Sequence, residues 1–415
     1  MKKFMKLAVV GMCLSLAITG LVANGQGEEE VAETEKPVRI WYHSGLEPSL
    51  HKTLFSHSDI QTEQTVSPPK DYMTKLDLAI ATNDEPDIMF MLVQDVPKYV
   101  EKGILAPVDG AFEGDTFELY TEGWRRMVTY GDNVYMVPYV NSATAIFYNR
   151  DILKEAGLEE PKDNWSFDQF MEYLEILTLK NAAGETIRYA IQLTPDSPIE
   201  SRPSLTRILL TWLWNFGAKP VSNDGKTAQG YINSKEAVEA MVFVQNIYKK
   251  GYAPKENIPN GFENGRVAMH ATGSWMIGFW NTNFPNIDIG VVSHPKYKEN
   301  ADTVMAWGWS LSSRSKNKEN AIQVLRSITE PETLVDFSEK SSMLIPREDV
   351  VDLLDLDPLT KKIAQYASYS KPYPPVVEST EFNDILNEAF AKIIFGANVK
   401  STLDNVAVKL DAILK

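Results

Sequence analysis

The sequence predicts an α/β fold in which helices cover a largely parallel sheet. Within the first hundred residues, short apolar runs typical of strands alternate with segments of helical period, and this order favours parallel strands joined by helices. The composition, with 44% hydrophobic and 23% charged residues, is that of an ordinary globular protein. The length of 415 residues is enough for two domains or more, each with a sizeable core.

The amino-terminal segment, residues 1–25, has the pattern of a cleavable signal peptide. Three lysines precede an uncharged apolar run at 7–22, which is shorter than the roughly 20 residues that a membrane-spanning helix needs. Small residues at 23 and 25 predict cleavage before Gln26, and an uncleaved anchor is the alternative. The only cysteine, Cys13, lies inside this segment, so the mature chain would have no disulfide and no cysteine nucleophile. We therefore expect a periplasmic or otherwise extracytoplasmic protein.

Acidic residues dominate the charge of the chain. The formal net charge is −15, and an acidic surface repels phosphate backbones, so nucleic acid is not an expected partner. The glutamate-rich segment 26–36, QGEEEVAETEK, is largely polar and is predicted to form a flexible tether before the globular part.

The globular part begins with two predicted strands separated by a helix. Residues 38–41 are a β-like run, and residues 71–81 carry apolar side chains at helical spacing. The apolar run at 87–92 is predicted to be a buried strand, and 96–102 a short helix. Residues 131–133 lie between two strand-like stretches and predict a hairpin.

The later elements continue the mixed pattern. A strand is expected at 145–148, and a short helix at 151–156 that Gly157 ends. Further helices are expected after the capping signals Ser166–Gln169 and Asn233–Glu236, and at 382–395 and 403–414.

The sequence contains no motif of a familiar catalytic or cofactor chemistry. GxGxxG, GxxxxGK[ST], HExxH and GxSxG are all absent. None of the histidines has a carboxylate cluster at ligand spacing, so we expect no metal, no cofactor and no catalytic residue. Because acidic residues are abundant, a secreted glycoside hydrolase with paired carboxylates stays open as an alternative. The five histidines are His43, His51, His57, His270 and His294.

Eight segments carry a resemblance that extends, in order, over essentially the whole mature chain. They are EPDIMFM (85–91), VEKGILAPVD (100–109), PYVNSATAIFYNRDILKEAGLEEP (138–161), NWSFDQFMEYLEILT (164–178), FENGRVAMHATGSW (262–275), IGVVSHP (289–295), AWGWSLSSRSKNKENAIQVLRSIT (306–329) and LIPR (344–347). Each is degenerate alone, but the ordered set resembles the extracellular solute-binding proteins of ABC importers, in particular the maltose-type carbohydrate-binding group (family 1).

The resemblance implies a two-lobe fold of the periplasmic binding protein type II, with a ligand cleft between the lobes. Lobe 1 would span 37–140 plus about 308–333, and lobe 2 about 141–305 plus 336–415. Three segments would cross between the lobes, near 139–142, 305–309 and 330–337. Such a protein captures a mono- or oligosaccharide, closes by hinge bending, and delivers the sugar unaltered to the subunits of an inner-membrane ABC permease. Monomers are the norm of the family. A non-sugar solute such as a polyol phosphate or a polyamine is the alternative ligand.

Tryptophans are the first candidates for ligand contact, because a sugar has polar edges and C–H faces that stack on flat rings. Trp275 follows the Gly-Ser corner at the expected end of a strand, where the resembled family has its stacking tryptophan. The alternative is a core position between helix and sheet. Trp307 and Trp309 alternate around Gly308 and would face the same way on a strand, toward the cleft or as braces of the hinge.

The remaining candidates follow from their positions in the resembled family. His43 and Ser44 follow the first strand, and Gln94 and Asp95 follow the second parallel strand. Asn141 and Ser142 lie on the first crossing. Arg347 lies in a segment that often reaches the cleft, and a surface salt bridge is its alternative role. Met91 stands where an aromatic residue would be expected, which weakens the transfer of a maltose-like ligand. The candidates from family position are therefore His43, Ser44, Gln94, Asp95, Asn141, Ser142 and Arg347.

Overall fold

The computed structural model describes most of the globular part of the chain. The described residues are 36–43, 48–193, 203–256, 258–341, 343–366, 370–371, 373–374 and 376–414. Residues 37–415 form one compact unit, separate from residues 1–36. The expected signal peptide and, apart from Lys36, the expected tether lie outside the described residues. Among the helices in the described ranges, none is both long and apolar enough to cross a membrane.

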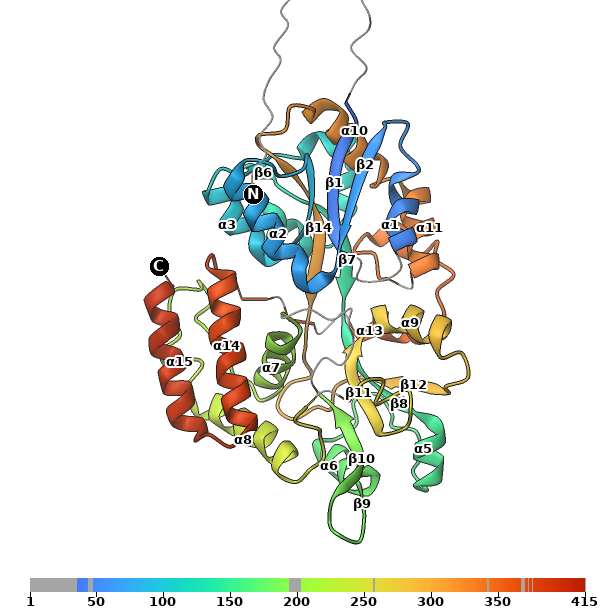
Figure 1. The fold of residues 1–415 in the computed structure, drawn as a ribbon, viewed down its shortest axis with the longest axis vertical. Helices are drawn as coiled ribbons and strands as arrows, with labels where there is room; N and C mark the ends of the chain where they lie inside the picture. Colours follow the sequence, from blue (N-terminus) through green and yellow to red (C-terminus); the bar gives the residue numbers. More distant parts are fainter. Residues whose placement is uncertain are drawn as a thin grey trace, which may run out of the picture. The chain divides into compact units, whose positions relative to one another are not determined.

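The first lobe is built on a six-stranded sheet with the order β2-β1-β3-β14-β4, in which β7 also pairs with β14 (Figure 1). β1 runs parallel to β2 and β3, whereas β14 runs antiparallel to β3, β4 and β7. The strands predicted at 38–41 and 87–92 are confirmed as β1 and β3. The six strands are β1 (Val38–His43), β2 (Thr62–Ser67), β3 (Ile88–Leu92), β4 (Leu105–Ala106), β7 (Val137–Ser142) and β14 (Met305–Ser312).

Helices flank this sheet, with α2 and α3 to the left of the strands in Figure 1 and α1 and α11 to the right. The helices predicted at 71–81 and 96–102 are confirmed as α2 and α3, and the predicted hairpin as the antiparallel pair β5 (Thr129–Tyr130) and β6 (Asn133–Val134). The helices are α1 (Pro48–Phe55), α2 (Pro69–Thr82), α3 (Val96–Glu101), α4 (Glu122–Val128), α10 (Lys318–Ser327), α11 (Pro331–Ser341) and α12 (Glu348–Val351), with the 3-10 turns η1 (Val93–Asp95), η2 (Asp109–Ala111) and η3 (Thr116–Leu119).

The second lobe contains a five-stranded sheet with the order β12-β8-β11-β10-β9. Only β10 and β11 are parallel among these pairs, so the largely parallel sheet that the sequence predicted does not extend to this lobe. The strands are β8 (Thr144–Asn149), β9 (Leu179–Lys180), β10 (Thr186–Gln192), β11 (Val267–Gly273) and β12 (Ile289–Val292), with the small pair β13 (Asp302–Thr303) and β15 (Ser370–Lys371).

In Figure 1, α7, α8, α14 and α15 lie to the left of the strands of the second lobe, α5, α9 and α13 lie near β8 and β12, and α6 lies beside β10. Their bounds are α5 (Arg150–Glu155), α6 (Phe167–Leu177), α7 (Pro203–Asn215), α8 (Lys235–Lys249), α9 (Trp275–Asn283), α13 (Pro358–Tyr366), α14 (Ser379–Ile394) and α15 (Val399–Ile413).

Local capping decides where two of these helices begin. The Ser166 side chain accepts from the backbone N–H of Gln169, so the predicted cap of α6 is confirmed. The cap predicted at Asn233 is wrong by one residue, because Ser234 caps α8 and accepts from the backbone N–H of Ala237. The Asn233 amide is engaged elsewhere, accepting from the Gly230 N–H at 2.8 Å and donating to Asp404.

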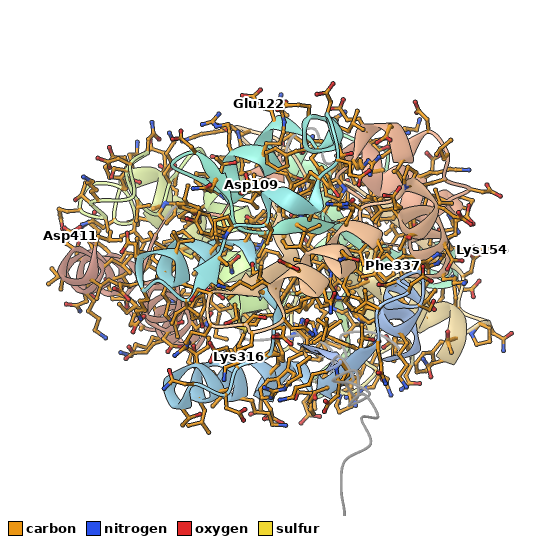
Figure 2. The ribbon with its side chains drawn as sticks, turned by 90° about the horizontal axis from the view of Figure 1, so that it is seen from above. Asp109, Glu122, Lys154, Lys316, Phe337 and Asp411 are labelled. Atoms are coloured by element: carbon orange, nitrogen blue, oxygen red, sulfur yellow. The ribbon has the colours of Figure 1, made fainter. Side chains whose placement is uncertain are left out.

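The chain remains in the first lobe for longer than the sequence suggested. Phe337, Ile345 and Val350 pack in the hydrophobic core of the first lobe, and α11 packs on α1. Phe337 is labelled in Figure 2. The expectation that the second lobe resumes at 336 therefore sets this crossing too early. The core that α11 joins is a tertiary property, which the local sequence does not show.

Candidate functional site

A cavity of about 630 Å³ lies where residues of both lobes meet, a size within the range of small-molecule sites. The first lobe contributes residues from η1, α3 and α4, including Gln94 and Trp124. The second contributes the segment before α14, including Tyr373 and Val376, which pack in the second core. Val304, directly before β14, also lines the cavity.

Gln94 is the sequence-predicted candidate that the structure places in this cavity. It lies in η1, directly after the carboxyl end of β3, where ligands of α/β sheets bind. Its side chain is 6% exposed, and within the described ranges neither its amide nitrogen nor its amide oxygen has a hydrogen-bond partner. A buried amide without partners is unusual in a folded protein. Both amide atoms are themselves buried, so a bound molecule would reach them only after the side chain turned.

Asp95 does not line the cavity but joins the two lobes. Its carboxylate accepts a hydrogen bond from the Ser379 hydroxyl at the start of α14. Beside it, the Lys98 ammonium donates to Thr380 at 3.4 Å. Burial raises the pKa of Asp95 to about 6, against the opposing effects of Ser379 and Lys98. The structure therefore assigns Asp95 an interlobe contact rather than the ligand contact that the sequence suggested.

Trp307 and His43 lie together at the carboxyl ends of the strands of the first lobe. The half-buried Trp307 ring stacks on Phe90, with centroids 4.9 Å apart and planes 15° apart. The His43 ring meets Trp307 edge-on at 4.5 Å, and burial lowers the pKa of His43 to about 4. Trp307 pairs in register with Leu92, the residue before Val93 of the cavity wall. None of the three aromatic residues is itself in the lining of the cavity.

Trp309 faces the same way as Trp307, as the alternation around Gly308 predicted, and both rings contact Phe90. Trp309 is nevertheless 0% exposed, packed edge-on against Phe55 at 4.8 Å and Tyr139 at 5.5 Å. It braces the first core in this structure, so its prediction as a ligand contact is corrected.

Trp275 begins α9 and is half-buried. Its ring lies against Gly273 at the end of β11, where an added Cβ would be 1.8 Å from the ring carbon Cζ3. The corner needs a glycine because the indole occupies the space of a side chain. The guanidinium carbon of Arg207, a buried residue of α7, lies 4.5 Å from the ring centroid. A cation held over an aromatic face stabilises the orientation of that ring.

Asp302 and His294 are two further buried titratable residues of the second lobe. Asp302 is 0% exposed and accepts from the backbone N–H groups of Thr144 and Thr303 at 2.6 and 2.7 Å. Burial raises the pKa of Asp302 to about 6, whereas the hydrogen bonds from Thr144 and the positive charge of Arg207 act in the opposite direction. Burial also lowers the pKa of His294 to about 3. Both residues feel the charge of Arg207, whose guanidinium lies over the Trp275 ring.

Arg347 is a structural residue in the first lobe. It is 4% exposed, and its guanidinium donates to both carboxylate oxygens of Asp349, at 2.7 and 2.9 Å, and to the carbonyl of Thr329. A guanidinium engaged in this way does not face the cavity, so the prediction of a ligand contact is corrected. The alternative salt bridge is present, although it is buried rather than on the surface.

Three further candidates have no described side chain. Ser44 lies outside the described residues. The backbone of Asn141 and Ser142 belongs to β7, paired with Ala306 and Met305 of β14, and their side chains lie outside the description. Their roles stay predictions.

Trp124 of α4 is one of the cavity residues that the sequence analysis missed. No resembled segment covers α4, and an isolated tryptophan in a short helix gives no signal of its surroundings. Within the described residues, no group of three or more His, Cys, Asp or Glu side chains is placed to hold a metal ion.

Residues 47–334 match the model of the bacterial extracellular solute-binding protein family. The chain belongs to this family. A putative binding protein of Brucella abortus is 24% identical over 367 residues, which cover 83% of both chains. An ABC transporter solute-binding protein of Thermotoga lettingae, solved with α-D-tagatose, aligns with a TM-score of 0.81 and 20% identity, covering 92% of this chain and 100% of that one. An ABC substrate-binding protein of Listeria monocytogenes, solved with cycloalternan, aligns with a TM-score of 0.79 and 21% identity, covering 91% and 98%.

These likenesses establish the two-lobe α/β fold of extracytoplasmic binding proteins for this chain. The family and its structural neighbours are binding proteins, so the resemblance noted in the sequence is confirmed.

Proposed function

We propose that this protein captures a mono- or oligosaccharide between its lobes and delivers it, chemically unchanged, to the membrane subunits of an ABC importer. The observation that carries the proposal is the cavity between the lobes, with its aromatic walls and the unpartnered amide of Gln94. The family membership supports it, as do neighbours solved with the sugars tagatose and cycloalternan.

The site residues suit a sugar for a physical reason. Trp275 and Trp307 are half-buried residues, and an indole ring is the kind of surface on which a C–H face of a pyranose stacks. Micromolar affinity corresponds to about −8 kcal/mol, which two stacking contacts of ~1 kcal/mol beyond area burial and several hydrogen bonds supply. Alongside the tryptophans we propose ligand contacts for Gln94, His43, Ser44, Asn141 and Ser142.

The alternatives make different demands on the cavity. A polyamine needs carboxylates, and a glycosidase needs a pair of them across the scissile bond. The described cavity lining contains no Asp or Glu, which favours a binding protein for an uncharged ligand over both. A polyol phosphate needs clustered cations, and Arg126 is the only Arg, Lys or His in that lining.

We further propose that export uses a signal peptide cleaved before Gln26, that residues 26–36 tether the mature protein, and that it acts as a monomer. We also propose the lobe ranges expected from the sequence, with the third crossing later in the chain than 330–337.

A thermal-shift screen of the chain from Gln26 to Lys415 tests the proposal. Mono- and oligosaccharides, glycerol phosphates and polyamines are compared, and each ligand is recovered and analysed. A ligand that binds only the folded state raises the melting temperature by mass action. A saturable shift with a sugar that is recovered intact is expected. Sugar recovered cleaved, or a shift with a phosphate or polyamine alone, contradicts the proposal.

A further inference from the structure

We infer that the Asp302 carboxylate joins two of the connections between the lobes to each other, and that it confines the bending of both connections to Ala143 and Val304. Asp302 is 0% exposed, so it acts as a positioning residue and not through contact with a ligand. This role rests on the proposed capture of a ligand between two moving lobes.

Each of the two connections passes from one sheet to the other within a single residue. The first runs from β7 of the first lobe to β8 of the second, and only Ala143 separates these strands. The second runs from β13 of the second lobe to β14 of the first, and only Val304 separates them. The two connections lie side by side, because β7 and β14 pair antiparallel.

The backbone ladder between the connections ends at the boundary of the first lobe. Its last pair joins Ser142 to Met305. Beyond that pair, β8 bonds to β11 and β12, whereas β13 pairs with β15. Among the described strands, no backbone pair therefore joins the two connections inside the second lobe.

The Asp302 side chain joins them where the ladder has ended. Its Oδ2 accepts from the backbone N–H of Thr144 at 2.6 Å, and its Oδ1 accepts from the Thr144 hydroxyl. Its Oδ1 also accepts from the backbone N–H of Thr303 at 2.7 Å. Thr144 is the first residue of β8, so the carboxylate of one connection holds the beginning of the other. Hydrogen bonds to an ionised acceptor are stronger than neutral ones. We call these three residues the Asp302 clamp.

Helix α7 attaches the Asp302 clamp to the body of the second lobe. The backbone N–H of Thr303 also donates to the Thr211 hydroxyl oxygen of α7, at 3.2 Å. The positive charge of Arg207, also in α7, acts on the pKa of Asp302 against the effect of burial. A buried carboxylate requires such compensation, so α7 both places the clamp and stabilises its charge.

Two joined points therefore bound the bend in both connections. The ladder pair of Ser142 with Met305 lies on the first-lobe side, and the Asp302 clamp lies on the second-lobe side. Ala143 and Val304 lie between them, one on each connection. Lobes that turn at these two residues turn about one common axis, whereas without the clamp each connection could shift by itself.

Pulsed electron–electron double resonance between one spin label on each lobe tests this role. Lys102→Cys, after α3, and Lys154→Cys, in α5, provide exposed label sites in the chain from Gln26 to Lys415, which contains no native cysteine. No ligand is added, so the result does not depend on which ligand the protein binds.

Loss of the carboxylate should displace the lobes. In Asp302→Asn, we expect the fraction of molecules with label distances outside the wild-type range to rise about tenfold, the effect of losing a hydrogen bond to an ionised group. Thr144→Val loses the hydroxyl but keeps the backbone N–H, so it should give a smaller rise in the same direction.

Glu85→Gln is the matched control, because it removes a buried carboxylate that lies within one lobe. Glu85 is 8% exposed and accepts from the Arg314 guanidinium at 2.6 Å and from the Ser312 hydroxyl at 3.0 Å. This variant, like Asp302→Asn, should lower the melting temperature, but its distance distribution should remain that of the wild type.

Wild-type distances in folded Asp302→Asn and Thr144→Val would overturn the role of Asp302 and leave the proposed sugar capture standing. The same displacement in Glu85→Gln would also overturn it, because the loss of any buried carboxylate would then loosen the lobes. If Asp302→Asn does not fold, Thr144→Val decides between the same outcomes. Absence of sugar binding in the thermal-shift screen contradicts the proposed function without changing these distances.

Discussion

Replacing Gly273 with alanine tests how the Gly-Ser-Trp corner holds its tryptophan. The indole of Trp275 lies over Gly273, and a Cβ there would be 1.8, 2.2 and 2.3 Å from three carbons of the ring. The glycine is therefore required by the close approach of a side chain rather than by an unusual backbone angle. In Gly273→Ala either the ring or the backbone of the corner must move.

The size of the effect follows from this geometry. Carbon atoms in contact lie about 3.5–4.0 Å apart, so the ring has to shift by about 2 Å. Overpacking of this kind lowers the free energy of unfolding by about 1–3 kcal/mol. Loss of a sugar stacking contact of ~1 kcal/mol weakens affinity about fivefold.

Denaturant unfolding and calorimetric titration measure the two effects, using the sugar with the largest thermal shift. Gly278→Ala is the matched control in the same helix, because its Cβ would meet only the Ser341 carbonyl oxygen, at 3.6 Å. That variant should be neutral or more stable by about 0.5–1 kcal/mol, since alanine favours a helix over glycine.

A double-mutant cycle isolates the ring itself. If the indole is the obstacle, Gly273→Ala should have no further effect on stability in a Trp275→Ala background. Wild-type stability and affinity in Gly273→Ala would refute the placement of Trp275 over the corner.

Three more outcomes are expected. Trp275→Ala should weaken sugar affinity about five- to tenfold with its circular dichroism unchanged, because only the stacking surface is lost; unchanged affinity would remove Trp275 from the site. Arg347→Met should lower the free energy of unfolding by about 2 kcal/mol without changing affinity, because it leaves Asp349 unpaired; an affinity loss at unchanged stability would restore Arg347 as a ligand contact. Burial raises the pKa of Asp95 to about 6, so the folded protein holds that proton more tightly than the unfolded chain. Relative to Asp95→Asn, wild-type stability should therefore fall by up to ~3 kcal/mol as pH rises from 4 to 6, measured by denaturant unfolding, and a constant difference over that range would contradict the buried contact with Ser379.

Much of the first lobe could be predicted because its signals are local. A β-like run placed β1 correctly, a continuous apolar run placed β3, and helical spacing placed α2. The cap of α6 was predictable because a serine and a backbone N–H three residues later meet in any helix start. The shift of the α8 cap to Ser234 was not, because the Asn233 amide is engaged by Asp404, far along the chain.

The candidate site, too, could be predicted only in part from the sequence. Sequence position placed Gln94 at the carboxyl end of β3, and alternation placed Trp307 and Trp309 on one face of β14. The sequence could not show which of the two tryptophans on that face is buried in the core. Trp309 is covered because Phe55 and Tyr139, from other parts of the chain, pack over it, whereas Trp307 lies at the edge.

By itself the sequence determined the family, the α/β class of the first lobe and the residue types available to a sugar, because strand period, helix period and ordered segments are properties of neighbouring residues. Only the tertiary structure decided which polar groups stay unmet. Arg347 is satisfied by Asp349 and Asp95 by Ser379, while the polar side-chain atoms of Gln94 and Trp124, two residues that line one cavity, have no described partner. Whether a buried polar group has a partner depends on residues that folding brings beside it from distant parts of the chain.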